Sequence, residues 1–117
     1  MRPSFVSLHP YFKAHPGKLD TIKAGFQRFV EKTASEEEMV FYGFTVNDNG
    51  DGEFFCREAY KNAKGVLRHL ENVGPLLAEM LTMADLVRVE LHGPGAELKK
   101  LKEPLAHLKP AWFVTAE

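Results

Sequence analysis

A turn signal between two strand patterns constrains the fold of this chain more than any other feature. Residues 47–52 read Asn-Asp-Asn-Gly-Asp-Gly, and both Asn-Gly and Asp-Gly favour tight hairpin turns. Residues 39–46, before the turn, are dense in aromatic and β-branched side chains, and residues 53–58 continue the strand pattern after it. The sequence therefore predicts a β-hairpin near the middle of the chain.

Strand and helix patterns alternate on both sides of this hairpin. Residues 4–12 alternate in hydropathy as a strand does, and apolar residues recur at helical spacing from Leu19 to Val30, which predicts a helix of about four turns. The patterns after the hairpin predict a helix over 63–73, a short helix over 76–83, a strand over 85–92, a short helix over 96–102 and a last strand over 111–115.

The order of these elements is that of the split β-α-β plan. It predicts an α+β fold: a ferredoxin-like antiparallel sheet with helices on one face. The length of 117 residues suits a single domain over residues 1–117. Its core would span about residues 5–92, and residues 93–117 would form a C-terminal extension to which the pattern assigns no role.

Alternation also predicts which side chains the uncovered face of the sheet carries. In the strand over 85–92 we expect Leu86 on the uncovered face and Val87 under the helices. The uncovered face would carry Phe5, Ser7, His9, Tyr11, Leu86, Arg88, Glu90 and His92. Because large apolar patches are rarely left open to water, we expect a second copy of the chain to cover this face. The result would be a homodimer that closes an α/β-barrel; a hydrated face on a monomer is the alternative.

Two motifs resemble those of a known family. The first consists of Glu58, Tyr60, Ala63, Leu67, His69 and Leu70, and the second of His15, Pro16, Gly17 and Lys18. They resemble the antibiotic biosynthesis monooxygenase-like family of dimeric α/β-barrels, in which Glu-x-Trp/Tyr ends the third strand and a Pro-Gly-Lys turn follows the first. The resemblance covers residues 5–92. The sequence differs from the family before the second strand, where members often have a glycine and this chain has Glu38-Met39-Val40.

The resemblance implies several activities, of which one fits best. Some family members oxygenate phenols or quinols without metal, flavin or other cofactor, and others degrade haem. In the haem degraders an Asn on the first strand, a Trp and a later iron-binding His surround the porphyrin. Here the first strand has no Asn, and His69 and Glu79 stand at the other two positions. We therefore expect a monooxygenase that acts on a small aromatic or quinol-like molecule, with no cofactor and no metal.

Such a reaction needs a base, a group that stabilises developing negative charge and an apolar pocket. We expect His9 or His92 to act as the base, because imidazole titrates near neutral pH. Arg88 is expected to stabilise the phenolate, and Tyr11 to donate a hydrogen bond to it.

Five further residues are candidates for substrate binding: Trp112, Phe113, His69, Tyr60 and Glu58. Trp112 and Phe113 would wall the pocket. Each candidate has a structural alternative. Glu58 and Tyr60 would fix the junction between strand and helix, His69 would pack in the core, and Trp112 would serve as an apolar plug or dimer contact.

Other classes of function stay open at this point. The same pocket would suit a non-catalytic small-molecule binder, and a filled barrel would suit a structural or interaction protein. Residues 47–58 also match much of a calcium-binding EF-hand loop, with Glu58 at its last position. However, the loop begins with Asn47 in place of Asp, and residues 39–46 form a strand pattern where an EF-hand has a helix. These differences favour the hairpin.

Composition and hydropathy indicate which kinds of partner and which compartment to expect. The 15 Lys+Arg and 16 Asp+Glu residues leave a net charge of -1, so we expect no nucleic-acid partner. No apolar run approaches the roughly 20 residues that span a bilayer, and the N-terminus lacks the apolar core of a secretory signal, so we expect no membrane association. The single cysteine, Cys56, fits a reducing compartment and predicts a cytoplasmic protein.

Overall fold

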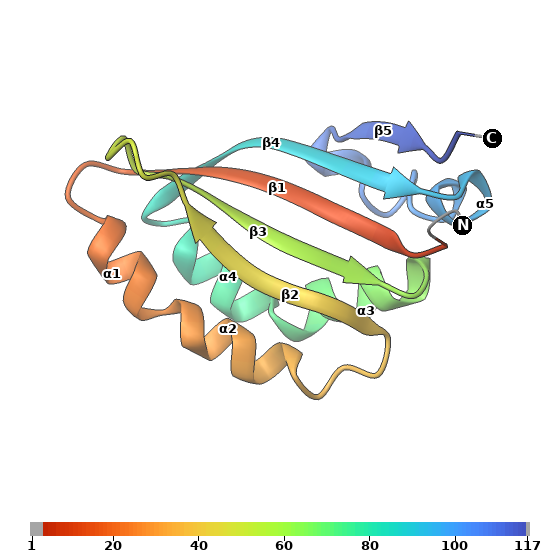
Figure 1. Ribbon diagram of the computed structural model, residues 1–117, viewed down its shortest axis with the longest axis horizontal. Helices are drawn as coiled ribbons and strands as arrows, with labels where there is room; N and C mark the ends of the chain where they lie inside the picture. The colour runs from red at the N-terminus through yellow and green to blue at the C-terminus, as the bar shows by residue number, and fades with distance from the viewer. Residues whose placement is uncertain (1–3, 117) are drawn as a thin grey trace.

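A computed structural model describes residues 4–116 as a five-stranded sheet packed against helices (Figure 1). The strands are β1 (Val6–Ala14), β2 (Met39–Val46), β3 (Glu53–Tyr60), β4 (Ala84–Gly93) and β5 (Ala111–Val114). The helices are α1 (Leu19–Ala24), α2 (Phe26–Thr33), α3 (Ala63–Asn72), α4 (Gly74–Met80), α5 (Gly95–Lys99) and the 3-10 helix η1 (Ala106–Leu108). Within this described range, no helix is both long enough and apolar enough to cross a bilayer.

The strand order is β2-β3-β1-β4-β5, with antiparallel pairing everywhere except between β4 and β5. The α+β, ferredoxin-like fold is thus confirmed, with one correction. The sheet is mixed rather than antiparallel, because the chain crosses over through α5 and η1 before β5 and so brings this strand in parallel to β4.

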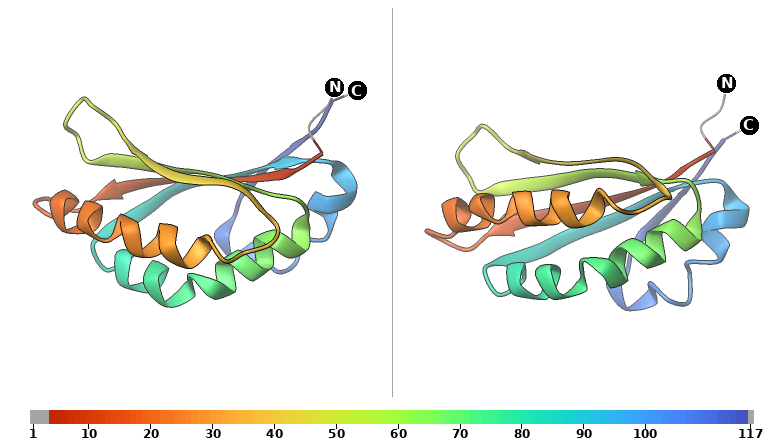
Figure 2. Two further views of the ribbon diagram at one scale, coloured as in Figure 1. Left: turned by 60° about the horizontal axis from the view of Figure 1, so that its bottom comes forward. Right: turned by 90° about the horizontal axis from the view of Figure 1, so that it is seen from below.

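Helices α1 to α4 lie on one face of the sheet and leave the opposite face bare (Figure 2). The predicted helix of about four turns is instead divided into α1 and α2 at Gly25. The Gly25 N–H bonds to the carbonyl of Ile22, three residues earlier, at 2.9 Å, which tightens the helix there. Glycine is a poor helix former, so the break falls where the helix is weakest.

The predicted hairpin is confirmed as the connection between β2 and β3. Gly50 and Gly52 have φ angles of 79° and 86°, a conformation that glycine adopts without strain. The side-chain oxygens of Asn47 and Asn49 accept the backbone N–H groups of Asn49 and Asp51, both at 3.0 Å. The side-chain oxygens of Asn47 and Asn49 therefore stabilise the turns of the loop itself. Strands rather than helices flank the loop, which contradicts the EF-hand alternative.

A β-bulge reverses the predicted facing of two residues. The register pairs Tyr11 with Arg88 but Phe12 with Leu86, so Val87 is an extra residue in β4. Leu86 consequently packs under the helices, whereas Val87 is 66% exposed. The prediction for this pair was wrong, because simple alternation does not continue through a bulge. Six other predicted residues do share the uncovered face: Ser7, His9, Tyr11, Arg88, Glu90 and His92.

Two apolar clusters form the core between sheet and helices. The first contains Val6, Leu8, Tyr60, Ala63, Val66, Val89, Leu91, Leu98, Leu101 and Leu105, and the second contains Phe12, Ala14, Ile22, Phe29, Phe54, Val73, Met80 and Ala84. Three leucines of the C-terminal extension belong to the first cluster, and the Glu97 carboxylate accepts the Ala63 N–H at 2.9 Å. The extension thus completes the core and supports the start of α3.

Candidate functional site: a buried carboxylate and imidazole

A cavity of about 80 Å³ lies on the helix side of the sheet, with walls drawn from both core clusters. Most of its wall is apolar. The side chains in the wall that carry polar or reactive groups are Tyr42, Cys56, Glu58 and His69. Leu81, at the end of α4, also lines it and is 38% exposed, so the cavity reaches the surface there.

Glu58 is the carboxylate of this cavity. Residues of β3 alternate between the two faces, and Glu58 falls on the inner face, where it is 4% exposed. The Tyr60 hydroxyl, two residues further along the strand, donates to Glu58 Oε1 at 2.6 Å. His69 Nε2 lies 3.3 Å from the same oxygen. The carboxylate therefore has the Tyr60 hydroxyl, the His69 ring and the Cys56 thiol as polar neighbours in otherwise apolar surroundings.

His69 extends this contact into a chain of side chains. Its ring is 2% exposed, and its Nδ1 lies 3.0 Å from Glu36 Oε2 in the turn before β2. The Asn72 amide donates to the same Glu36 oxygen at 2.8 Å and so holds that carboxylate in place. The four side chains thus form one chain of polar contacts, in the order Glu36, His69, Glu58, Tyr60.

Local sequence explains why α3 reaches Glu58. Asn62 caps the helix, since its side-chain oxygen accepts the Gly65 N–H at 2.9 Å. A Cβ at Gly65 would lie 2.7 Å from Cβ of Glu38, so only glycine permits this close approach. His69 follows Gly65 by four residues and lies on the same helix face. The close approach thereby brings the imidazole to the sheet.

Burial sets the proton affinities of the pair. Loss of solvent raises the pKa of Glu58 to about 7, although the hydrogen bond from Tyr60 opposes the rise. Burial lowers the pKa of His69, with the Glu36 carboxylate opposing. Burial also raises the pKa of Tyr60 and of Cys56, so the hydroxyl and the thiol keep their protons. Near neutral pH the Glu58 carboxyl group is accordingly divided between its protonated and ionised forms.

This arrangement can exchange one proton with a molecule in the cavity. A carboxyl group with a pKa near 7 is poised both to give and to take a proton at physiological pH. The apolar wall favours an apolar substrate with a few polar groups. Among the predicted substrate-binding residues, the structure brings Glu58, His69 and Tyr60 together.

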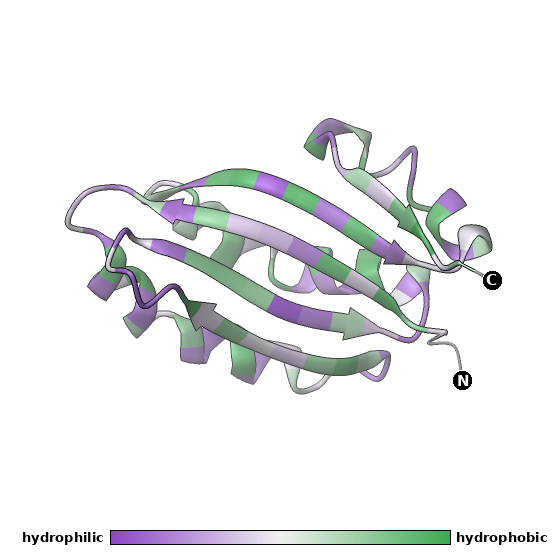
Figure 3. Ribbon diagram, turned by 45° about the horizontal axis from the view of Figure 1, so that its top comes forward, coloured by the Kyte–Doolittle hydropathy of each residue, from purple (hydrophilic) through white to green (hydrophobic). Residues whose placement is uncertain are grey.

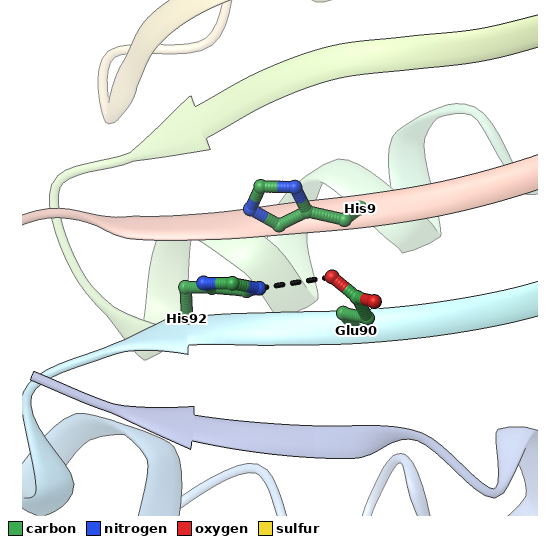
Figure 4. Close-up of side chains that lie close together, drawn as sticks. All are labelled: His9, Glu90 and His92. Atoms are coloured by element: carbon green, nitrogen blue, oxygen red, sulfur yellow. Dashed lines mark hydrogen bonds and ion pairs between the residues drawn. The ribbon is translucent and has the colours of Figure 1, made fainter.

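The four residues predicted as catalytic lie elsewhere. His9, His92, Arg88 and Tyr11 stand on the uncovered face, and none of them lines the cavity. Figure 4 shows His9 with Glu90 and His92 of the neighbouring strand. His92 Nε2 lies 3.0 Å from Glu90 Oε1, and the ring centroids of His9 and His92 are 4.2 Å apart. Because the sheet separates these four residues from the cavity, they would not contact a molecule bound there. Their catalytic role stays a prediction.

Trp112 and Phe113, predicted as pocket walls, point to opposite sides of β5. Trp112 packs partly buried against the first core cluster, with the Lys102 ammonium 5.0 Å from the centre of its ring. Phe113 is 44% exposed and stacks on His92 at 4.5 Å. Neither lines the cavity.

Three residues of the site were not predicted from the sequence: Glu36, Tyr42 and Cys56. Tyr42 and Cys56 belong to the inner faces of β2 and β3, and period-two spacing from Phe44 and Glu58 was a usable signal for both. Glu36 stands in an acidic run and gave no such signal, because its contact with His69 joins residues 33 positions apart.

No family model matches the sequence, and no curated protein matches it either. The fold, by contrast, matches several crystal structures. MupZ from Pseudomonas fluorescens has 38% sequence identity and a TM-score of 0.91, over 98% of this chain and 93% of that one. This match includes nearly all of the C-terminal extension.

Two further matches are more distant. A putative antibiotic biosynthesis monooxygenase from Chloroflexus aurantiacus has 17% identity and a TM-score of 0.63, over 78% of this chain and 93% of that one. Rv0793 from Mycobacterium tuberculosis has 19% identity and a TM-score of 0.66, over 78% of this chain and 95% of that one. These two establish the fold alone. With MupZ as a relative along almost the whole chain, and with the fold and motifs described above, the chain belongs to the antibiotic biosynthesis monooxygenase-like family.

Proposed function

We propose that this chain is an enzyme that transfers a proton between the Glu58–His69 pair and a small, mostly apolar substrate. The observation that carries the proposal is a fully buried carboxyl group with a pKa of about 7 that lines a cavity next to an imidazole. A purely structural site would place an apolar side chain there at lower cost, because burying an ionisable group is unfavourable.

Within this class, the reaction we propose is the cofactor-free oxygenation of a phenol or quinol-like molecule, in keeping with the names of the distant structural matches. The ionised Glu58 removes the hydroxyl proton, and His69 steadies the resulting carboxyl group. The electron-rich phenolate then reduces O₂, and a C–O bond forms at the ring carbon opposite the oxygen. Loss of the hydrogen on that carbon and cleavage of the O–O bond give a quinone and one water. O₂ is the oxidant, and all atoms are accounted for.

This proposal moves the base from His9 or His92 to Glu58. The reason is access: Glu58 lines the cavity, whereas His9 and His92 stand on the other face of the sheet. The roles predicted for Arg88 and Tyr11 would require a substrate on that other face.

The size of the cavity limits the substrate. At about 80 Å³ it is well below the roughly 300 Å³ of common ligand sites. A single-ring phenol is therefore the first candidate, and a larger ring system requires Leu81 and its neighbours on α4 to move. The same small volume favours a second function, binding of a small apolar molecule without turnover.

Oxygen uptake with a panel of one-ring and two-ring phenols tests the proposal. We expect turnover that increases as the pH rises through about 7, because ionisation of Glu58 creates the base. Glu58→Gln should lower the rate by at least about 100-fold. Glu90→Gln is the matched control, since Glu90 also contacts a histidine but lies on the uncovered face.

The outcomes separate the alternatives. Equal loss in Glu58→Gln and Glu90→Gln, or full activity in Glu58→Gln, would overturn the assignment of the base. Saturable binding of a phenol that Glu58→Gln weakens, without any oxygen uptake, would support the second function.

We also propose that the chain forms a homodimer through the uncovered face. Exposed apolar side chains on this side, among them Val87 (66% exposed) and Phe113 (44% exposed), support a covered surface. Val87→Glu should then yield a monomer in sedimentation experiments, whereas a wild-type monomer would contradict the proposal. The cytoplasmic location stays a prediction.

A further inference from the structure

The uncovered face carries a cluster that the proposed function does not use. His9 of β1 stands opposite Glu90 of β4 in the strand register, and His92 is two residues further along β4 on the same face. One ligand atom from each of the three residues lies within 4.8 Å of those from the other two. All three side chains are partly buried, and they meet across two adjacent strands (Figure 4).

The chemistry of this set is that of a metal site. Two imidazoles and a carboxylate suit borderline transition-metal ions such as Zn²⁺, Co²⁺ or Ni²⁺, and suit Ca²⁺ or Mg²⁺ poorly. Tetrahedral coordination at about 2.0–2.1 Å places ligand atoms about 3.4 Å apart. The pair formed by Glu90 and His92, at 3.0 Å, is already near this spacing. The ligand atom of His9 lies within 4.8 Å of both.

Neighbouring groups hold the three side chains in place. The Ser7 hydroxyl lies 2.7 Å from His9 Nε2 and restrains the orientation of the imidazole. Phe113 stacks on the His92 ring at 4.5 Å. Phe55 flanks His9, with the ring centroids 5.9 Å apart. The rings are therefore ordered before any ion arrives, which lowers the entropic cost of binding.

Arg88 is the one cation in direct contact with the cluster among the described residues. Its guanidinium donates to Glu90 Oε2, while Oε1 faces His92. One carboxylate oxygen is thus positioned for an ion and the other is held by Arg88. The positive charge of Arg88 weakens the attraction of a second cation.

We propose that His9, Glu90 and His92 bind one divalent transition-metal ion on the uncovered face of the sheet. Three protein ligands leave at least one coordination position free for water, a small ligand or a group from a second copy of the chain. This proposal does not depend on the proposed function, because the sheet separates the cluster from the cavity.

The test uses the full chain, stripped of metal and free of any histidine tag, with Zn²⁺ alone as the titrant in calorimetry. We expect saturable binding, and at least tenfold weaker binding in each of His9→Gln, Glu90→Gln and His92→Gln. His15→Gln is the matched control: His15 Nε2 also lies 3.0 Å from a carboxylate, that of Asp85, but no third ligand joins this pair among the described residues. It should bind Zn²⁺ as the wild type does.

Two further readouts sharpen the test. Arg88→Gln should strengthen binding, because it removes the competing charge. Co²⁺ should give a visible absorption spectrum that is lost in His92→Gln. One ion per two chains, again lost in the three variants, would support the site and place it between copies.

Three results would overturn the proposal. These are the absence of saturable Zn²⁺ binding below about 1 mM, binding that the three replacements leave unchanged, and an equal loss in His15→Gln. Because the three side chains are only partly buried, thermal unfolding of each variant should confirm that its fold is intact.

Discussion

Each face of the sheet holds a carboxylate beside a histidine, and the two pairs have opposite properties. On the inner face, burial raises the pKa of Glu58 to about 7 and lowers that of His69. On the uncovered face, hydrogen bonds from His92 and Arg88 lower the pKa of Glu90. The same two chemical groups are thus prepared for proton transfer on one face and for a stable negative charge on the other. Two things differ: the helices cover only the inner face (Figure 3 views the bare one), and only Glu90 has an arginine as a hydrogen-bond partner.

The largest expected effect concerns the inner pair. Because the folded pKa of Glu58 is raised from 4.5 to about 7, its stabilising contribution is complete below about pH 4.5 and is lost as the pH rises through 7. The loss amounts to roughly 3 kcal/mol. Glu58→Gln cannot titrate, so it should gain most of this amount relative to the wild type between pH 5 and pH 8 in urea unfolding. A constant difference across this pH range would contradict the raised pKa.

The bulge in β4 gives the next largest effect. Leu86→Ala should cost about 2 kcal/mol, because Leu86 packs against both core clusters. Val87→Ala should change the free energy of unfolding of the monomer by less than about 0.5 kcal/mol, because Val87 is 66% exposed. Urea unfolding of the two variants measures both. A larger loss in Val87→Ala than in Leu86→Ala would contradict the bulge and support the simple alternation predicted from the sequence.

A third prediction concerns Gly65→Ala, which should disturb the contact between Glu58 and His69 without replacing either residue. Gly65→Ala would normally stabilise a helix by up to about 1 kcal/mol. Here the new Cβ would lie 2.7 Å from that of Glu38, so we expect a loss of about 1–3 kcal/mol instead. The shift of α3 should also move the NMR resonances of the His69 ring. Gly43→Ala, where a Cβ meets nothing within 4 Å, is the control for glycine replacement as such.

The smallest effect concerns the uncovered pair. Since the pKa of Glu90 is lowered, its contribution is present above about pH 4.5 and is lost as the pH falls, the opposite direction from Glu58. Solvent limits the amount, so Glu90→Gln should destabilise the protein by no more than about 1 kcal/mol at pH 7. This difference should fade towards pH 3. An effect as large as that of Glu58→Gln would mean that the uncovered face excludes water, as a partner subunit would ensure.

Much of the fold could be predicted from local patterns. The hairpin, the strand and helix order and most of the residues on the uncovered face follow from turn chemistry and from hydrophobic periods that act over a few residues. The failures have two causes. The bulge at Val87 and the parallel direction of β5 depend on pairing with distant strands, whereas the division of the helix at Gly25 follows from a local weakness that the helical spacing of apolar residues concealed.

The candidate site was predicted only in part for the first of these reasons. Glu58, Tyr60 and His69 were singled out by motif, but the contact between His69 and Glu58 at the cavity depends on the close approach of α3 at Gly65. Glu36 was missed because it meets His69 across 33 positions of sequence. His9, Glu90 and His92 were placed on one face by alternation, whereas the distances that make them a ligand set come from strand register.

The sequence by itself determined the types of element, their order and the chemical groups available to the protein, because these depend on side-chain identity and short-range spacing. Only the tertiary structure decided which carboxylate was buried under the helices and which met the cationic Arg88. Burial is a property of the packed chain: the helices cover Glu58 and leave the face of Glu90 open. The two functions that we propose, proton transfer at Glu58 and cation binding at Glu90, rest on that difference.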